Sequence, residues 1–396
     1  MTGNDAMTRN EAVELGIDPE SGAEIIQVTS SATAHDNIYH EVSYFDAGSR
    51  WFMFQKPKTN NTFGQGEVWR CDLQDYSCQL VAEDIEVSRG MAVSPDQRYF
   101  YCLRRKDKSG HALLRTEIAT LEQKTIPLDI DTSQTPVYTG GSAGPDNRTY
   151  ICGIRLGTRV FGIVKIDLAT GAGKLILEQG PDHLNMHPQI EPGKGQDIMV
   201  QHNRGAEIDE EGKCIKMIGP EGATLYLIDI NGENRRSLPI GKPYTWRCGG
   251  HEAWIGSTGS ILFSTDPEDA DPLKAKAEGI RLGRLRMIRP GDETSRVVFK
   301  GDYYHGGANP SKDGRFVVCQ TQAPEVYIAV GSIKTGKLRV LHASRSIKLH
   351  ISHFSMPKPY FSPDCRWVVF NSDRTGRPQI YAAKLPEGIL AELEKP

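Results

Sequence analysis

Short apolar strands separated by tight polar turns recur along the whole chain. In each recurrence, a strand is followed by a Pro, Asp or Gly turn and a second apolar strand, the pattern of a β-hairpin. Seven such segments begin at His40, Arg89, Gly140, His187, His251, His305 and Lys358. Most of them are followed by a third strand that ends near an acidic residue, and then by a turn and a fourth strand. Four antiparallel strands per unit, at a period of roughly 50 residues, predict the blades of a β-propeller and disfavour a pair of β-sandwiches.

The two ends of the chain predict how the ring closes. The last unit ends at QIYAAKLPEG, from Gln379, and lacks a fourth strand, whereas GAEIIQVTS, from Gly22, is a spare strand before the first unit. Pairing these segments would close the ring and remove an exposed sheet edge. We therefore predict an all-β fold over residues 22–396, a seven-bladed β-propeller with an N-terminal strand in the last blade. Residues 1–21 are predicted to be an N-terminal tail, either disordered or a dimer contact.

Composition and charge narrow the choice of partners. A net charge of -3 in 396 residues predicts no nucleic-acid partner. The N-terminus lacks an apolar core after a basic start, and no apolar run has the length of a transmembrane helix, so neither a signal peptide nor a membrane is expected. The eight cysteines lie mostly within strand-like runs, which is typical of buried thiols in a reducing compartment. The sequence predicts a cytoplasmic protein and gives no indication of its oligomeric state.

Alignment of the seven units on their turns places several histidines at one repeat position. Five residues before the turn proline, or its equivalent, the chain has His40, Gly90, Gly140, His187, His251, His305 and Lys358. This position begins the innermost strand of a blade, and these strand starts surround the mouth of the central channel in a propeller. A single polar residue there could simply cap a strand. Four of the 11 histidines at one position instead predict a pocket.

The residue types at this position indicate the chemistry of the pocket. Histidines can bind a divalent metal or act as general acid or base near neutral pH, and Arg and Lys favour carboxylate substrates. Further polar candidates lie one strand away or just upstream: His35, Tyr39, Tyr138, His202, Arg204, Arg247, His350 and His353. Glu41 and Glu252 follow histidines and are expected to point away from the channel, which disfavours a glycosidase with paired acids. The pocket therefore predicts an anionic substrate and a histidine base.

Taken together, the units resemble the oligogalacturonate lyases, propeller polysaccharide lyases of pectin breakdown. The resemblance spans SGAEIIQVTS to GRPQIYAAKLP and rests on the order of MHPQIEP, GGHEAW, YHGGANPSKDG and MPKPYFSPD. It implies β-elimination, in which a base removes the C5 proton of a uronate and the C4–oxygen bond breaks. A metal such as Mn²⁺ or cationic side chains would stabilise the developing enediolate. The resemblance implies that His251 is catalytic and that His305 is a manganese ligand.

The seventh unit departs from the family pattern. Met356 and Lys358 stand where the family has two further histidine ligands, and His353 stands at a glutamine ligand. Methionine is a poor ligand for a hard cation, and a protonated lysine cannot bind one. One hypothesis is that the ammonium of Lys358 replaces part of the charge of the metal and binds the uronate. The alternative is a rearranged metal site of His305, His350 and His353 with a water.

The fourth unit also departs from this pattern. Thr224 matches the position of a catalytic arginine in the family, and Arg204 on the preceding strand is the candidate replacement. The predicted function is thus a lyase acting on a short uronate-containing oligosaccharide, with two groups of site residues. The catalytic candidates are His251, Arg204 and Lys358, and the substrate-binding candidates are His40, Tyr138, His187, His202 and Arg247.

Two other classes of protein are considered. A non-catalytic, TolB-like binding propeller would share the generic turns but would leave the aligned histidines without a purpose. A metal-dependent hydrolase or lactonase would require acidic metal ligands, and the channel positions offer too few of them.

Overall fold

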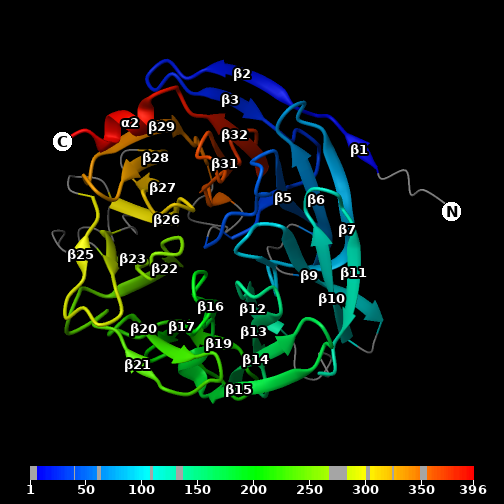
Figure 1. Ribbon diagram of the computed structural model, residues 1–396, viewed down its shortest axis with the longest axis vertical. Helices are drawn as coiled ribbons and strands as arrows, with labels where there is room; N and C mark the ends of the chain where they lie inside the picture. Colours follow the sequence, from blue (N-terminus) through cyan, green and yellow to red (C-terminus); the bar gives the residue numbers. More distant parts are fainter. Residues whose placement is uncertain are drawn as a thin grey trace.

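The computed structural model describes residues 7–39, 41–59, 64–107, 110–130, 137–266, 283–299, 304–322, 325–347 and 355–396. Antiparallel sheets stand around a common centre, and the chain passes from one to the next in sequence order (Figure 1). Strand pairing divides the sheets into seven units of four strands, so the predicted seven-bladed propeller is confirmed. No helix in the described ranges is long and apolar enough to cross a membrane.

The first three blades follow the predicted hairpins. Their strands are β4 (Asp36–Asn37), β5 (Trp51–Pro57), β6 (Gly64–Asp72) and β7 (Cys78–Val87); β8 (Ala92–Val93), β9 (Tyr99–Asp107), β10 (Gly110–Glu117) and β11 (Gln123–Pro127); and β12 (Val137–Ala143), β13 (Thr149–Arg155), β14 (Phe161–Asp167) and β15 (Gly173–Gln179). A single residue pair, Ile85 with Arg104, joins the first two blades into one sheet.

The next three blades repeat this order. Their strands are β16 (Gln189–Ile190), β17 (Asp197–Asn203), β20 (Ala223–Asp229) and β21 (Arg236–Ser237); β22 (Cys248–Trp254), β23 (Ile261–Thr265), β24 (Leu285–Ile288) and β25 (Arg296–Val297); and β26 (Tyr304–Pro310), β27 (Phe316–Gln322), β28 (Val326–Ser332) and β29 (Leu338–Ala343). The fourth blade also carries a short hairpin of β18 (Glu207–Ile208) and β19 (Cys214–Lys216), and the 3-10 turn η1 (Pro181–His183) precedes it.

The seventh blade combines the two ends of the chain. Strands β30 (Tyr360–Phe361), β31 (Trp367–Ser372) and β32 (Gln379–Lys384) are completed by β3 (Glu24–Gln27), which pairs antiparallel with β32. The predicted closure is confirmed. Within residues 1–21, β2 (Val13–Ile17) pairs with β3 and β1 (Thr8–Arg9) pairs with β7, so both strands extend propeller sheets. Helix α2 (Ile389–Glu394) buries Ile389 and Leu393 against this end of the ring.

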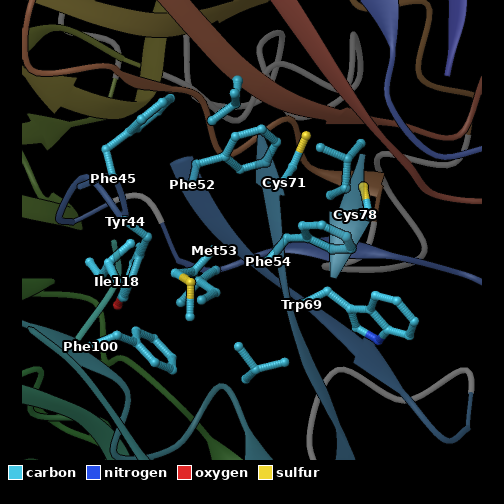
Figure 2. Close-up of a cluster of buried hydrophobic side chains, with 14 of the residues drawn as sticks. Tyr44, Phe45, Phe52, Met53, Phe54, Trp69, Cys71, Cys78, Phe100 and Ile118 are labelled. Carbon is cyan, nitrogen blue, oxygen red and sulfur yellow. The ribbon is translucent and has the colours of Figure 1, made fainter. Parts of the chain in front are cut away.

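The core lies between neighbouring blades. Because blades pack face to face, their middle strands are buried on both sides, which explains continuous apolar runs such as TYICGIR in β13. One cluster joins the first, second and seventh blades, and Figure 2 shows its aromatic centre around Phe52 and Phe54. All eight cysteines are free, and all except Cys214 are buried, as predicted.

The closing strand should carry a measurable share of stability. Ile26 on β3 is 0% exposed and pairs with Ala382, so Ile26→Ala is expected to lower the free energy of unfolding by about 2–5 kcal/mol in urea titrations. Ile17→Ala on the outer strand β2 is the control, because Ile17 is 72% exposed and its loss should change stability by less than about 0.5 kcal/mol. Equal effects of the two changes would contradict this role of β3.

Candidate active site in the central channel

The hydrogen bonds of the turns define the true register of the repeat. In each blade, the N–H that opens the first turn donates across the hairpin, at 2.8–2.9 Å, from Asp46, Ser94, Gly144, Glu191, Ile255, Ser311 or Ser362. The residues four positions earlier are Val42, Gly90, Gly140, His187, His251, Gly307 and Lys358. The predicted set of four aligned histidines is therefore wrong. His40 and His305 lie two residues too early, because Lys312 rather than Pro310 occupies the proline position of the sixth turn.

The aligned position has an unusual backbone conformation. Five of its seven residues have a positive φ, between 41° and 60°: Gly90, His187, His251, Gly307 and Lys358. Residues other than glycine rarely adopt this backbone conformation, and those that do are concentrated at functional sites. In β22 the pairing register shifts between Gly250 and Ala253, so His251 lies in a β-bulge. A bulge redirects a side chain, and it here sets His251 apart from the regular alternation of the strand.

A cavity of about 320 Å³ follows the inner strands and is lined by residues of all seven blades. His187, Lys358, Tyr39 and Glu41 are among its lining residues. The Tyr39 ring lies 5.5 Å from that of His187 and is stacked at 6.5 Å on that of His251. Of the predicted residues, His187 and Lys358 line the cavity. His251 is not among its described lining residues and is linked to His187 through the ring of Tyr39. Glu41 was expected to point away from the channel, and that prediction is wrong.

His187 and Glu41 form an ion pair at the cavity wall, with Nδ1 2.5 Å from Oε1. Burial lowers the pKa of His187, but the charge and hydrogen bond of Glu41 outweigh it and raise that pKa to about 9. His187 is therefore an imidazolium near neutral pH. Such a group can attract a carboxylate but cannot accept a proton.

Glu252 follows His251 and is fully buried. Burial raises the pKa of its carboxyl to about 7, the charge of Glu41 adds to the rise, and His187 opposes it. The cavity wall therefore contains a cationic histidine between two acidic residues with different environments.

Lys358 has a buried partner. Its Nζ lies 2.7 and 2.8 Å from the two carboxylate oxygens of Asp36, and the two side chains are 2% and 0% exposed. Asp36 also accepts hydrogen bonds from Gln55 and Asn371. The sequence predicts that Lys358 is a catalytic cation that binds the uronate. The structure contradicts this prediction, because Asp36 already neutralises the charge of Lys358.

His305 is 1% exposed, and neither of its ring nitrogens has a hydrogen-bond partner in the described part of the chain. Burial and the nearby charge of Arg284 lower the pKa of His305 to about 4, so the ring is neutral and able to ligate a metal. Gln320 Oε1 and Thr321 Oγ1 on the adjacent strand β27 are also buried without a partner in the described residues. Unsatisfied buried groups of this kind fit the donor side of a ligand site.

Three of the predicted residues that the structure describes do not converge on the cavity. Among the described lining residues there is no Arg204, Arg247 or His202. The Arg204 guanidinium donates to three backbone carbonyls, Arg247 pairs with Asp266 at 2.6 Å, and His202 contacts Asp182 at 3.3 Å. Tyr138 lies in β12, whereas His40, His350 and His353 fall outside the described residues. In the described ranges, no three His, Cys, Asp or Glu residues cluster as a metal site.

Sequence reasoning missed Asp36 and Glu41 as site residues, and it included their neighbour Tyr39 only as a further polar candidate. All three belong to the segment HDNIYHE, which has five polar residues in seven where the first blade needs an inner strand. That density of polar groups is the signal that could have identified them, because a buried strand tolerates polar groups only when they are paired.

Comparison with known proteins agrees with the fold and with the predicted resemblance. No protein-family model matches the chain. It is 22% identical over 412 residues to the oligogalacturonide lyase of Pectobacterium atrosepticum, covering 94% of this chain and 96% of that protein. The structure of an oligogalacturonate lyase in complex with manganese has a TM-score of 0.72 at 16% identity, covering 97% and 98% of the two chains. An oligogalacturonate lyase structure from Vibrio parahaemolyticus has a TM-score of 0.70 at 16% identity, covering 97% and 99%.

The charge of His187 should depend on Glu41. Glu41→Gln removes the main interaction that favours the imidazolium, so the pKa of His187 should fall from about 9 to about 6.5 or below, measured by NMR titration of the ring. The pair stabilises the fold below about pH 6.5, and this contribution is lost as the pH rises through about 9. Glu14→Gln, on the exposed strand β2, should leave the titration unchanged. An unaltered His187 in Glu41→Gln would refute the assignment.

The pair of Lys358 and Asp36 should be essential to the fold. Lys358→Met leaves Asp36 buried without its cation and should lower the free energy of unfolding by about 3–5 kcal/mol in urea titrations. The double variant Lys358→Met with Asp36→Asn removes both charges and should recover most of this loss. If the double variant is no more stable than the single one, the ion pair is not the cause.

Proposed function

We propose that this protein is a lyase that cleaves a short uronate-containing oligosaccharide by β-elimination, with oligogalacturonate as the model substrate. The observation that carries the proposal is that His251 and the cationic His187, at equivalent positive-φ positions of adjacent blades, both lie against the ring of Tyr39, which lines the cavity. The similarity to proteins named oligogalacturonide lyase supports the choice of reaction.

The proposed reaction assigns different tasks to the two histidines. The imidazolium of His187 attracts the uronate carboxylate and stabilises the negative charge that develops on it. His251 removes the C5 proton, the electron pair forms the C4–C5 double bond, and the C4–oxygen bond breaks. The leaving oxygen takes up a proton, so the net change is transfer of hydrogen from C5 to that oxygen and no water is consumed. The ring of Tyr39 packs against both histidines, tilted by 35° to that of His187 and stacked on that of His251.

A divalent metal such as Mn²⁺ would supply further charge neutralisation at the carboxylate. His305 fits as a ligand because its ring nitrogens are buried without partners in the described residues, and its register partner Thr321 places a second unpartnered oxygen on the same face of the sheet. His350 and His353 are the proposed additional ligands from the sequence. In this proposal Lys358 does not replace the metal; it neutralises Asp36 and holds the first blade against the seventh.

The test is the ultraviolet absorbance of the unsaturated product, followed with uronate oligosaccharides in the presence of chelator or manganese. His251→Ala should lower kcat by about 10²- to 10⁴-fold, because it removes the base, while the circular dichroism spectrum remains unchanged. His111→Gln, a histidine of the second blade paired with Glu86, is the control and should keep the activity. Loss of activity in chelator and its return with manganese would support the metal ligands.

A folded protein that yields no unsaturated product from any uronate oligosaccharide would overturn the lyase proposal and favour a binding propeller. Full activity of His251→Ala would refute the role of this residue but not the reaction.

A further inference from the structure

A chain of buried amide side chains leads from the backbone of the fourth blade to Glu252. Asn203 Nδ2 donates to the carbonyl oxygens of Leu184 and Asn185. Gln201 Nε2 donates to Asn203 Oδ1 at 2.5 Å. The remaining atom of the Gln201 amide, its oxygen, lies 2.8 and 3.0 Å from the two carboxyl oxygens of Glu252. Gln201, Asn203 and Glu252 are 4%, 0% and 0% exposed, so these contacts are shielded from bulk solvent.

The backbone carbonyls at one end of this series of hydrogen bonds determine which amide atoms donate and which accept. A backbone carbonyl can only accept, so the Asn203 nitrogen must face Leu184 and the Asn203 oxygen must face Gln201. The Gln201 nitrogen must then face Asn203. Rotating Gln201 to turn its nitrogen toward Glu252 would set two amide oxygens 2.5 Å apart, and rotating Asn203 as well would set its oxygen against the carbonyls. The Gln201 oxygen can therefore accept only from Glu252.

We propose that Glu252 is a neutral carboxylic acid that donates its proton to Gln201 Oε1, and that it is the positioning residue for His251. A carboxylate at this place would face an oxygen at 2.8 Å with no hydrogen between them, which is repulsive in a buried site. Four ionisable groups interact electrostatically with Glu252, so that the pKa of one affects that of the other: Glu41, His187, Tyr39 and Cys248. The pKa of about 7, raised first by burial, is consistent with this state.

Glu252 is held at both its backbone and its side chain. Its carbonyl oxygen accepts from Gln189 Nε2 at 2.9 Å, and the carbonyl of Gln189 in turn accepts from Trp254 Nε1 at 3.1 Å. These contacts tie the bulge of β22 to β16 and β17 of the fourth blade. Because His251 is the preceding residue, with a φ of 58°, its orientation depends on this double attachment.

Ionisation of Glu252 would have two consequences. It would break the hydrogen bond to Gln201 and release the bulge that carries His251. It would also add a second negative charge beside Glu41, where an anionic substrate must bind. The positioning role therefore rests on the proposed lyase function, whereas the protonated state of Glu252 does not.

Infrared spectroscopy of the whole protein tests the protonated state without substrate. At about pH 6 the wild type should show the carbonyl band of a buried protonated carboxylic acid, which should disappear with a midpoint near pH 7 and be absent from Glu252→Gln. Glu41→Gln is the matched control and should keep the band, because Glu41 accepts from His187 and is ionised. A wild type without the band, or a Glu252→Gln variant that retains it, would overturn the proposal.

Stability provides a second readout that does not need activity. Glu252→Gln can still donate an N–H to Gln201 and should fold like the wild type, whereas Glu252→Leu cannot donate and should unfold at lower urea. Folding raises the pKa of Glu252 above its ordinary 4.5, so this carboxyl makes the wild type less stable as the pH rises from about 4.5 to about 7. The stability of Glu252→Gln should lack this part of the pH dependence. Equal destabilisation by Gln and Leu would contradict the donor role.

The positioning role is read from the pH profile of kcat/KM. In the wild type, kcat/KM should begin to fall as the pH rises above about 7. In Glu252→Gln this fall should begin at least one pH unit higher, and kcat/KM at about pH 6 should be retained. An unchanged profile in a variant that has lost the infrared band would refute the positioning role alone. An inactive wild type that still shows the band would refute the lyase proposal and leave the protonated state supported.

Discussion

The antiparallel pairing of β3 with β32 is the interaction on which the rest of the structure depends. It joins residues near position 25 to residues near position 383 and leaves no gap between the first and last blades (Figure 1). The same junction brings Asp36 to Lys358 and Asn37 to Asn371 across more than 300 residues. The central cavity has seven sides only when this ring is closed. The candidate site is therefore a property of the whole ring and not of any one blade.

The channel wall places three acidic residues in poorly solvated positions, and each is accommodated differently. Asp36 faces the ammonium of Lys358, Glu41 faces the imidazolium of His187, and Glu252 is proposed to retain its proton. A buried carboxylate is costly unless it is paired, and protonation is the remaining solution for Glu252, which forms no ion pair with a cation of the described residues. These three solutions determine the charge that an anionic substrate meets. His187 and Lys358 both line the cavity, but the side chain of Lys358 is 2% exposed and that of His187 is 16% exposed.

Backbone geometry links this electrostatic arrangement to the proposed chemistry. The positive φ shared by His187, His251 and Lys358 turns three side chains out of the regular alternation of their strands. In the second and sixth blades, glycine holds the same conformation without a side chain. The repeat thus supplies a positive-φ position in five of the seven blades, and the residue type there decides whether the blade contributes chemistry or only backbone.

The sequence by itself determined the β-propeller, its seven blades and the strand that closes it, because strand alternation and turn residues are local signals repeated seven times. It also identified His187 and His251, whose place in the repeat follows from their own turns. Only the tertiary structure decided the register of the sixth blade, where Pro310 stands two residues before the position that the hydrogen bonds of the turn define. Only the closed ring decided the partners: Lys358 finds Asp36 from the opposite end of the chain, and Arg204 and Arg247 find nearby acceptors instead of the cavity. Charges choose partners by distance in the folded molecule, and no local pattern encodes that distance.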